Sequence, residues 1–60
     1  MMATWVVRYR FRGVDGKWVQ SFMYKTGNSP DQAKAAAQVD LDKSGTEWEI
    51  LEVRMVGEGR

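Results

Sequence analysis

The sequence predicts an α+β domain of ββαβ layout, with a three-stranded antiparallel sheet in the spatial order 2-1-3 and one helix packed on one face. Two segments in which apolar and polar residues alternate are joined by an Asp-Gly pair, which is typical of a β-hairpin. A capped, alanine-rich segment follows and predicts a helix, and a third apolar stretch then predicts the last strand. At 60 residues the chain is expected to form a single domain over 1–60, with 57–60 as a frayed tail.

The first strand is expected over residues 4–12, where large apolar residues alternate with arginines. Successive side chains of a strand point to opposite faces, so this segment separates a core face from a cationic face. The core face carries Trp5, Val7, Tyr9 and Phe11. The opposite face carries a row of three guanidinium groups, from Arg8, Arg10 and Arg12.

Asp15 and Gly16 predict a two-residue type I′ turn that leads into a second strand over residues 17–24. A loop of that length determines which residues of the two strands face each other. The resulting register places Tyr9 opposite Phe22, Val7 opposite Tyr24, and Phe11 opposite Gln20.

The helix is expected to begin after Ser29, a favoured N-cap, with Pro30 in its first turn and Gln32 completing a capping box. It is expected to end at Leu41 or Lys43, before a stop at Gly45. Its apolar arc is expected to contain Ala33, Ala36, Ala37, Val39 and Leu41.

Asp40 falls within the expected apolar arc of the helix, so its carboxylate needs a partner. We expect it to bond a tyrosine, an arginine or a backbone donor near the helix end. The alternative, an acid with a raised pKa, would require a cleft and a second catalytic group.

The third strand is expected over residues 48–56, and its alternation is ambiguous. We assign the charge-free set to the core, namely Leu51, Val53 and Met55. The other face would then carry Trp48, Ile50, Glu52, Arg54 and Val56. Pairing this strand with the first puts the first strand in the centre of the sheet.

Composition excludes several classes of function. The chain has no cysteine and no histidine, so we expect no thiolate or histidine metal site, no cofactor, no small-molecule substrate and no enzymatic activity. No run approaches the roughly 20 apolar residues of a membrane span, and the start does not resemble a signal peptide. We therefore expect a cytoplasmic protein with no membrane association.

The sheet face that the single helix leaves uncovered is the candidate partner-binding site, because apolar patches ringed by arginine are typical of contact surfaces. The expected partner is another protein or a second copy of the chain, as a homodimer. The opposing interpretation is that the arginine stems lie over apolar neighbours, with Glu52 as counter-ion, and bind nothing. The candidate residues are Arg8, Arg10, Arg12, Met23, Lys25, Trp48, Ile50 and Arg54.

Nucleic acid is the alternative partner for this face. Residues 1–30 carry a net charge of +4 and residues 31–60 a net charge of −3, so the arginines could bind phosphates while Trp48 stacks on a base. The net charge of the whole chain is only +1, whereas most such binders are strongly basic.

The segments YRFRGVDGKW, GNSPDQAKAAA and WEILEVRMV, in this order, resemble small phage and prophage accessory proteins of ββαβ layout. The resemblance covers the whole chain and is one of architecture. It implies a protein that binds and blocks host machinery, as anti-CRISPR and other anti-defence inhibitors do. The resemblance assigns no role to individual residues.

Overall fold

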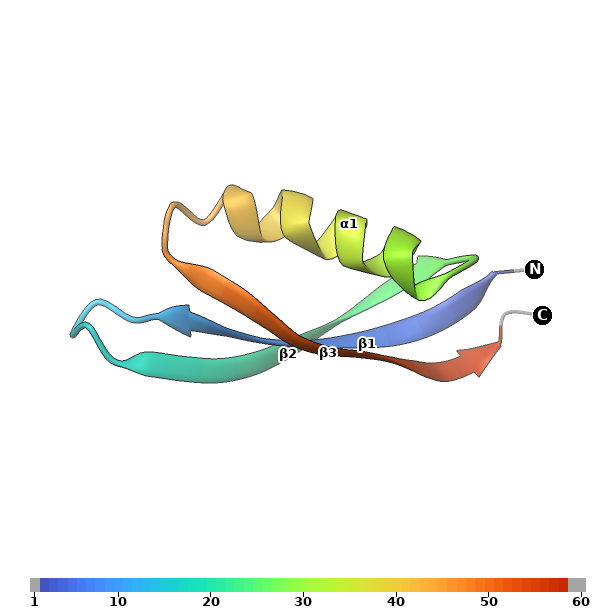
Figure 1. Ribbon diagram of the computed structural model, residues 1–60, viewed down its shortest axis with the longest axis horizontal. Helices are drawn as coiled ribbons and strands as arrows, with labels where there is room; N and C mark the ends of the chain where they lie inside the picture. Colours follow the sequence, from blue (N-terminus) through green and yellow to red (C-terminus); the bar gives the residue numbers. More distant parts are fainter. Residues whose placement is uncertain (1, 59–60) are drawn as a thin grey trace.

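Strand β1 (Ala3–Arg12) lies in the centre of a three-stranded antiparallel sheet, between β2 (Trp18–Gly27) and β3 (Trp48–Glu58). The computed structural model describes residues 2–58, and helix α1 (Pro30–Asp42) lies across one face of the sheet (Figure 1). The predicted ββαβ order and the 2-1-3 sheet are confirmed. Gly57 and Glu58 belong to β3, so the predicted tail was wrong at these positions, and its last two residues lie outside the described part.

The hairpin loop has three residues, where two were predicted. The Gly16 N–H donates to the Gly13 carbonyl (2.9 Å) and the Gly13 N–H donates to the Lys17 carbonyl (2.8 Å). Gly16 has a φ of 81°, in the left-handed region that glycine adopts without strain. These features define a β-turn followed by a glycine bulge, the usual form of a three-residue hairpin loop.

The extra loop residue moves the hairpin register by one position. Val7 faces Met23, Tyr9 faces Ser21 and Phe11 faces Val19, so the predicted register was wrong. A shift of one residue turns every side chain of a strand to the other face. The side of β2 that was assigned to the uncovered face therefore lies against the helix.

Helix α1 confirms the predicted start and end. The Ser29 hydroxyl accepts a hydrogen bond from the Gln32 N–H (3.3 Å), and the helix ends at Asp42. Its buried residues are Ala33, Ala37 and Leu41, a stripe narrower than predicted. Val39 is 55% exposed, because two residues advance a helix by about 200° and so place Val39 away from Ala37.

Two irregularities in the pairing of β1 with β3 explain the ambiguous alternation of the third strand. Arg8 faces Glu52 and Tyr9 faces Ile50, so Leu51 is an extra residue in β3. A second register shift lies between Thr4 and Trp5 of β1. The core assignment of Leu51 was wrong, and both Ile50 and Val53 pack against the core.

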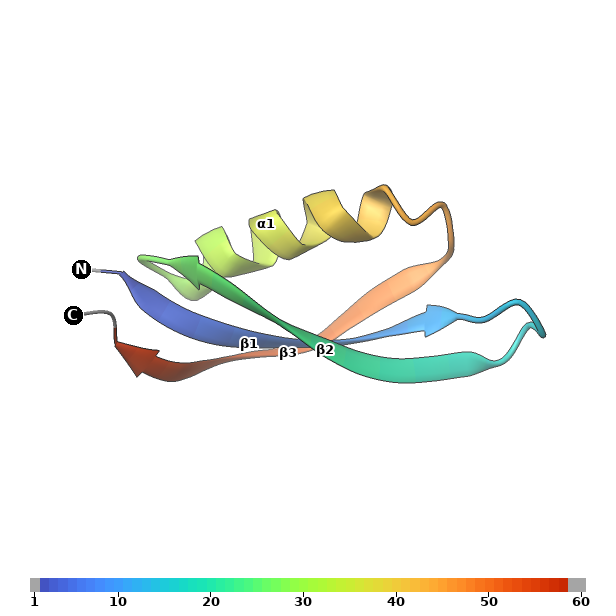
Figure 2. The same cartoon turned by 180° about the vertical axis from the view of Figure 1, so that it is seen from behind.

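The core is small and lies between α1 and the middle of the sheet. Val7, Ala33 and Ala37 are fully buried, and four partly buried residues pack against them: Trp5, Met23, Ile50 and Val53. Seen from behind, α1 again lies on one side of the sheet, and residues 2–58 place no element over the other side (Figure 2). No helix in this range is long and apolar enough to cross a membrane.

Candidate functional site

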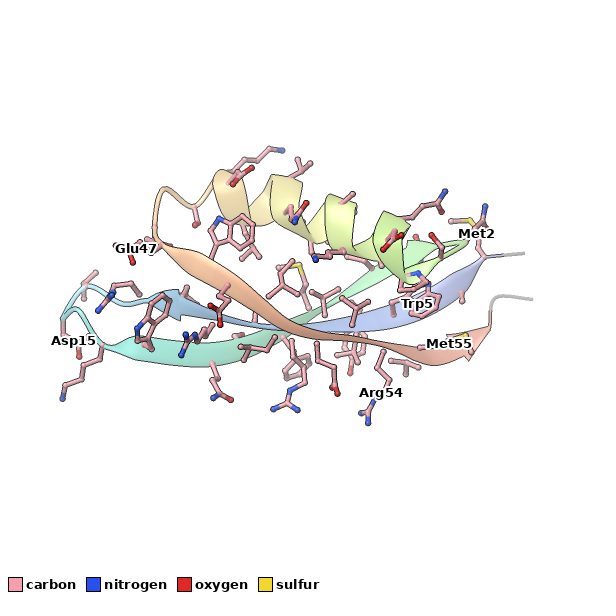
Figure 3. The ribbon with its side chains drawn as sticks, viewed as in Figure 1. Met2, Trp5, Asp15, Glu47, Arg54 and Met55 are labelled. Atoms are coloured by element: carbon pink, nitrogen blue, oxygen red, sulfur yellow. The ribbon has the colours of Figure 1, made fainter. Side chains whose placement is uncertain are left out.

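The sheet face directed away from α1, here called the open face, carries the three arginines of β1. Val7 is fully buried beneath the helix, so its neighbours Val6 and Arg8 point the opposite way, as do Arg10 and Arg12. The predicted separation of arginines from the core side chains is confirmed. Arg54 pairs with Val6 and also lies on the open face, away from α1 (Figure 3).

Each arginine of β1 has a glutamate beside it. Arg8 lies 3.8 Å from Glu52, Arg10 lies 3.2 Å from Glu49, and the Arg12 guanidinium donates to Glu47 at 3.4 Å. Exposed pairs of this kind contribute little to stability, typically about 0–1 kcal/mol each. Their main effect is on the potential of the face, because the cationic row lies next to an anionic row.

Trp18 begins β2 on the other side of the arginine row. The Arg10 guanidinium lies 4.5 Å from the centre of the Trp18 ring, and the Arg12 guanidinium lies 4.6 Å from it. Both distances fall within the range of cation–π contacts. The two arginines therefore hold the indole ring in a defined position although 39% of Trp18 is exposed.

Phe22 and Tyr24 continue the aromatic row along β2. Their rings meet edge to face, with centroids 5.6 Å apart and planes at 82°. Phe22 is 58% exposed and Tyr24 is 59% exposed. Val6 pairs with Tyr24 and is buried on this same face, so an apolar side chain lies beside the aromatic row at Tyr24. Large aromatic side chains left this exposed are typical of contact surfaces.

The open face is thus a set of three stripes, one from each strand. β2 contributes aromatic groups and β1 contributes guanidinium groups. β3 and the loop that precedes it contribute carboxylates. The stripes follow the strands because residues two apart share a face. The open face carries Trp18, Phe22, Tyr24, Arg8, Arg10, Arg12, Arg54, Glu47, Glu49 and Glu52.

Four of the predicted site residues lie on the α1 side of the sheet. Met23 and Lys25 were misplaced by the register error, because the three-residue loop turns β2 over. Trp48 and Ile50 were misplaced by the bulge at Leu51, since they pair with Phe11 and Tyr9, which belong to the core face. Of the eight predicted residues, the structure brings together Arg8, Arg10, Arg12 and Arg54 on the open face.

Sequence reasoning missed Trp18, Phe22 and Tyr24 as members of the open face. These three residues and Gln20 are spaced two positions apart, as Trp18, Gln20, Phe22 and Tyr24. A period of two could have identified them as one face of a strand. The intervening Val19 and Met23 are also apolar, so the pattern alone did not decide which face was buried.

Lys25 reaches from the α1 side of β2 to Asp40 of the helix and forms an ion pair with it. The hydrogen bond and the positive charge of Lys25 lower the pKa of the Asp40 carboxyl, and Lys43 adds a smaller effect in the same direction. Asp40 does find a partner, and that partner is a lysine where a tyrosine, an arginine or a backbone donor was expected. The lowered pKa argues against the alternative of a raised-pKa acid.

A pocket of about 230 Å³ lies on the α1 side, between the end of the helix and the sheet. Its lining is mostly apolar, from Tyr9, Phe11, Leu41, Ser44 and Thr46. The hydroxyls of Ser44 and Thr46 lie 3.1 Å apart, and Ser44 donates to the Leu41 carbonyl, so both serve the loop structure. Residues 2–58 hold no group of three or more acidic, histidine or cysteine side chains placed to bind a metal ion.

Comparisons with models of protein families, with curated proteins and with solved structures found no match to this chain.

Proposed function

We propose that this chain is a non-enzymatic protein-binding module that acts in the cytoplasm and contacts its partner through the open face. The observation that carries the proposal is the exposed aromatic row of β2 beside an arginine row. Phe22 and Tyr24 are each more than half exposed, while Trp18 is positioned by two guanidinium groups. Tryptophan, tyrosine and arginine are the residues most enriched among those that dominate binding energy at protein interfaces.

The glutamates beside the arginines favour a protein partner over a nucleic acid. A phosphate that approached Arg8 or Arg10 would also approach Glu52 or Glu49, and like charges repel. The Trp18 ring, moreover, already has guanidinium groups over it and is less available to stack on a base. A protein surface with polar groups of both signs, by contrast, can complement adjacent cationic and anionic rows.

The resemblance of the sequence to small phage accessory proteins of ββαβ layout motivates a more specific form of this binding. We propose that the module covers a functional surface of a host protein and thereby inhibits it. An inhibitor of this kind needs no catalytic group, and the open face supplies contact area rather than a reactive centre.

The test is affinity capture from a nuclease-treated bacterial lysate, with the full chain immobilised and three forms compared. Wild-type protein and Val39→Ser should retain the same host protein, since Val39 is exposed on the helix, on the other side of the molecule. Phe22→Ser should lose it while keeping a wild-type circular dichroism spectrum, because Phe22 is mainly exposed. Equal capture by Phe22→Ser and wild type would overturn the proposal.

The salt dependence of binding then separates the two kinds of partner. For the captured protein, calorimetry at 50 mM and 200 mM salt should give similar affinities. For single-stranded DNA or RNA the same measurement should show no binding at either salt concentration. Nucleic-acid binding at 50 mM that falls steeply toward 200 mM would favour the nucleic-acid alternative, since phosphate contacts release counterions.

A further inference from the structure

The two edges of the sheet differ in how they are protected against pairing with another strand. β3 carries two register shifts and charged residues at Glu49, Glu52 and Arg54, which are common means of blocking an edge. β2 pairs with β1 without interruption from Trp18 to Gly27 and contains no proline. Its one charged residue, Lys25, is held by Asp40. β2 is therefore a regular, almost uncharged edge.

The backbone groups that β2 presents outward follow from the alternation of an antiparallel ladder. The Gly13 N–H donates to the Lys17 carbonyl, so this odd-numbered pair is hydrogen-bonded between β1 and β2. The Arg12 N–H donates to the Glu47 carbonyl, so the even-numbered residues of β1 bond toward β3. Along the whole hairpin, the odd-numbered residues of β1 and β2 therefore bond each other. The even-numbered residues of β2 then direct their N–H and C=O groups away from the sheet. Loops and side chains of residues 2–58 form no hydrogen bond to these groups. The outward residues are Trp18, Gln20, Phe22, Tyr24 and Thr26.

We propose that β2 pairs with β2 of a second copy of the chain, antiparallel and related by a two-fold axis at Phe22. The product is a homodimer with one continuous sheet of six strands, three from each copy. This interface is formed by backbone groups of the β2 edge, whereas the proposed function uses side chains of the open face.

The register follows from the position of Phe22 at the midpoint of the outward residues. With the axis at Phe22, Gln20 pairs with Tyr24 of the second copy and Trp18 pairs with Thr26 of the second copy. Every outward N–H and C=O group of β2 then has a partner in the second copy. A two-fold axis at any other residue of β2 would leave some of these groups unpaired. A two-fold interface is also self-limiting, because pairing consumes both β2 edges and leaves only the protected β3 edges.

The charges of β2 are compatible with this pairing. Lys25 falls opposite Val19 of the second copy, so the two lysines do not face each other. A second copy stacked face to face on the open face would be less favourable. Because β1 is the central strand, a two-fold axis through the middle of the sheet would stack the β1 strands of the two copies. Arg8, Arg10 and Arg12 would then face the same arginines of the second copy, and their like charges would repel. The edge, and not the face, is the surface that fits a second copy.

Pairing at this edge would also stabilise the fold. Only Val7, among the large side chains of residues 2–58, is fully buried, and domains of about 60 residues with small cores are often stabilised by association. The continuous sheet would bring the aromatic residues of both copies together at its centre, so the open faces of the two chains would form one surface.

Analytical ultracentrifugation of the full chain tests the proposal directly. The expected mass is twice 6.9 kDa, falling to one chain on dilution. Gln20→Pro should be monomeric, because it removes an outward N–H and leaves the bonds to β1 intact. Gln20→Ala keeps this N–H and should remain dimeric. A wild-type monomer at every concentration, or a folded Gln20→Pro that dimerises as well as wild type, would overturn the proposal.

The register is tested by disulfide formation, since the chain contains no cysteine of its own. Two residues that face each other as a hydrogen-bonded antiparallel pair have Cα atoms about 5.5 Å apart, within the range of a disulfide. Phe22→Cys should therefore oxidise to a covalent dimer, while Gln20→Cys, which faces Tyr24 of the second copy, should form it far more slowly. Equal rates for the two variants would overturn the Phe22-centred pairing.

The failure of this inference is distinguishable from the failure of the proposed function. Gln20→Pro leaves the side chains of Trp18, Phe22 and Tyr24 in place, so a monomeric Gln20→Pro should still capture the host protein. Loss of capture in Phe22→Ser with the dimer intact would concern the open face alone. A monomeric wild type that captures its partner would overturn the edge pairing and leave the proposed function standing.

Discussion

Lys25 of β2 and Asp40 of α1 form an ion pair that joins the edge of the sheet to the helix. The pair connects two elements that are separated in the chain only by Asn28 and Ser29. It also explains why a carboxylate is accommodated beside the alanine stripe of the helix, because the lysine ammonium supplies the partner that the carboxylate needs.

The first prediction concerns the pH dependence of this pair. Because the folded-state pKa of Asp40 is lowered, the ionised carboxylate contributes stability above its unfolded pKa of about 3.9, and the contribution is lost as pH falls through the lower folded pKa. Asp40→Asn should therefore unfold at lower urea concentration than wild type at pH 7. The difference should shrink steadily below pH about 4.

Asp42→Asn is the matched control for this measurement, since Asp42 lies on the same helix and forms no ion pair within residues 2–58. It should show no comparable convergence with wild type on acidification. A difference between Asp40→Asn and wild type that is constant with pH, or grows in acid, would contradict the assignment.

The second prediction concerns the close approach of α1 to the sheet. Ala37 is fully buried against Val7, so Ala37→Leu should overpack this layer and lower the free energy of unfolding by about 1–3 kcal/mol. Ala35 is exposed on the same helix, and Ala35→Leu should change stability by less than about 0.5 kcal/mol. Urea denaturation followed by circular dichroism measures both. Equal effects would mean that the helix packs on a different stripe.

The third prediction tests the bulge in β3. Ile50 packs against the core and Leu51 is the extra, 43% exposed residue, although the two are adjacent in sequence. Ile50→Ala should cost about 2 kcal/mol of unfolding free energy, and Leu51→Ala no more than about 1 kcal/mol. Should Leu51→Ala prove the more costly of the two, β3 would follow the regular alternation and the bulge would be absent.

The fourth prediction tests the three-residue hairpin loop. Gly16 has a φ of 81°, so Gly16→Ala should lower the free energy of unfolding by about 1 kcal/mol through backbone strain. A Cβ at this position would meet nothing within 4 Å, so a steric clash is not the cause. Gly16→Asn should cost less, because asparagine tolerates this region. An asparagine variant as unstable as the alanine variant would argue against a left-handed residue here.

The parts of the fold that were predictable from sequence depend on local chemistry. Ser29 and Pro30 define the start of the helix through capping and a preset φ, and the alternation of residues 4–12 places the arginines of β1 on one face. Each of these features involves residues within a few positions of one another. Three of the eight residues of the candidate site, the arginines of β1, were therefore placed on the correct face, and Arg54 of β3 was placed there as well.

The remaining half of the site depended on two single-residue features. The extra loop residue before Lys17 turned β2 over, which brought Phe22 and Tyr24 to the open face and Lys25 to the helix. The extra residue Leu51 moved Ile50 to the core. Neither feature has a strong local signal, because Asp-Gly is compatible with loops of two or three residues and a bulge resembles a break in the pattern.

The order of the elements, the limits of the helix and the side of β1 that carries the arginines could be predicted from the sequence, since these features depend on short-range hydrogen bonding and side-chain alternation. Which sides of β2 and β3 face the helix became clear from the folded chain. That choice depends on the register of each strand against β1, where the burial of many side chains is compared at once and one residue reverses the result.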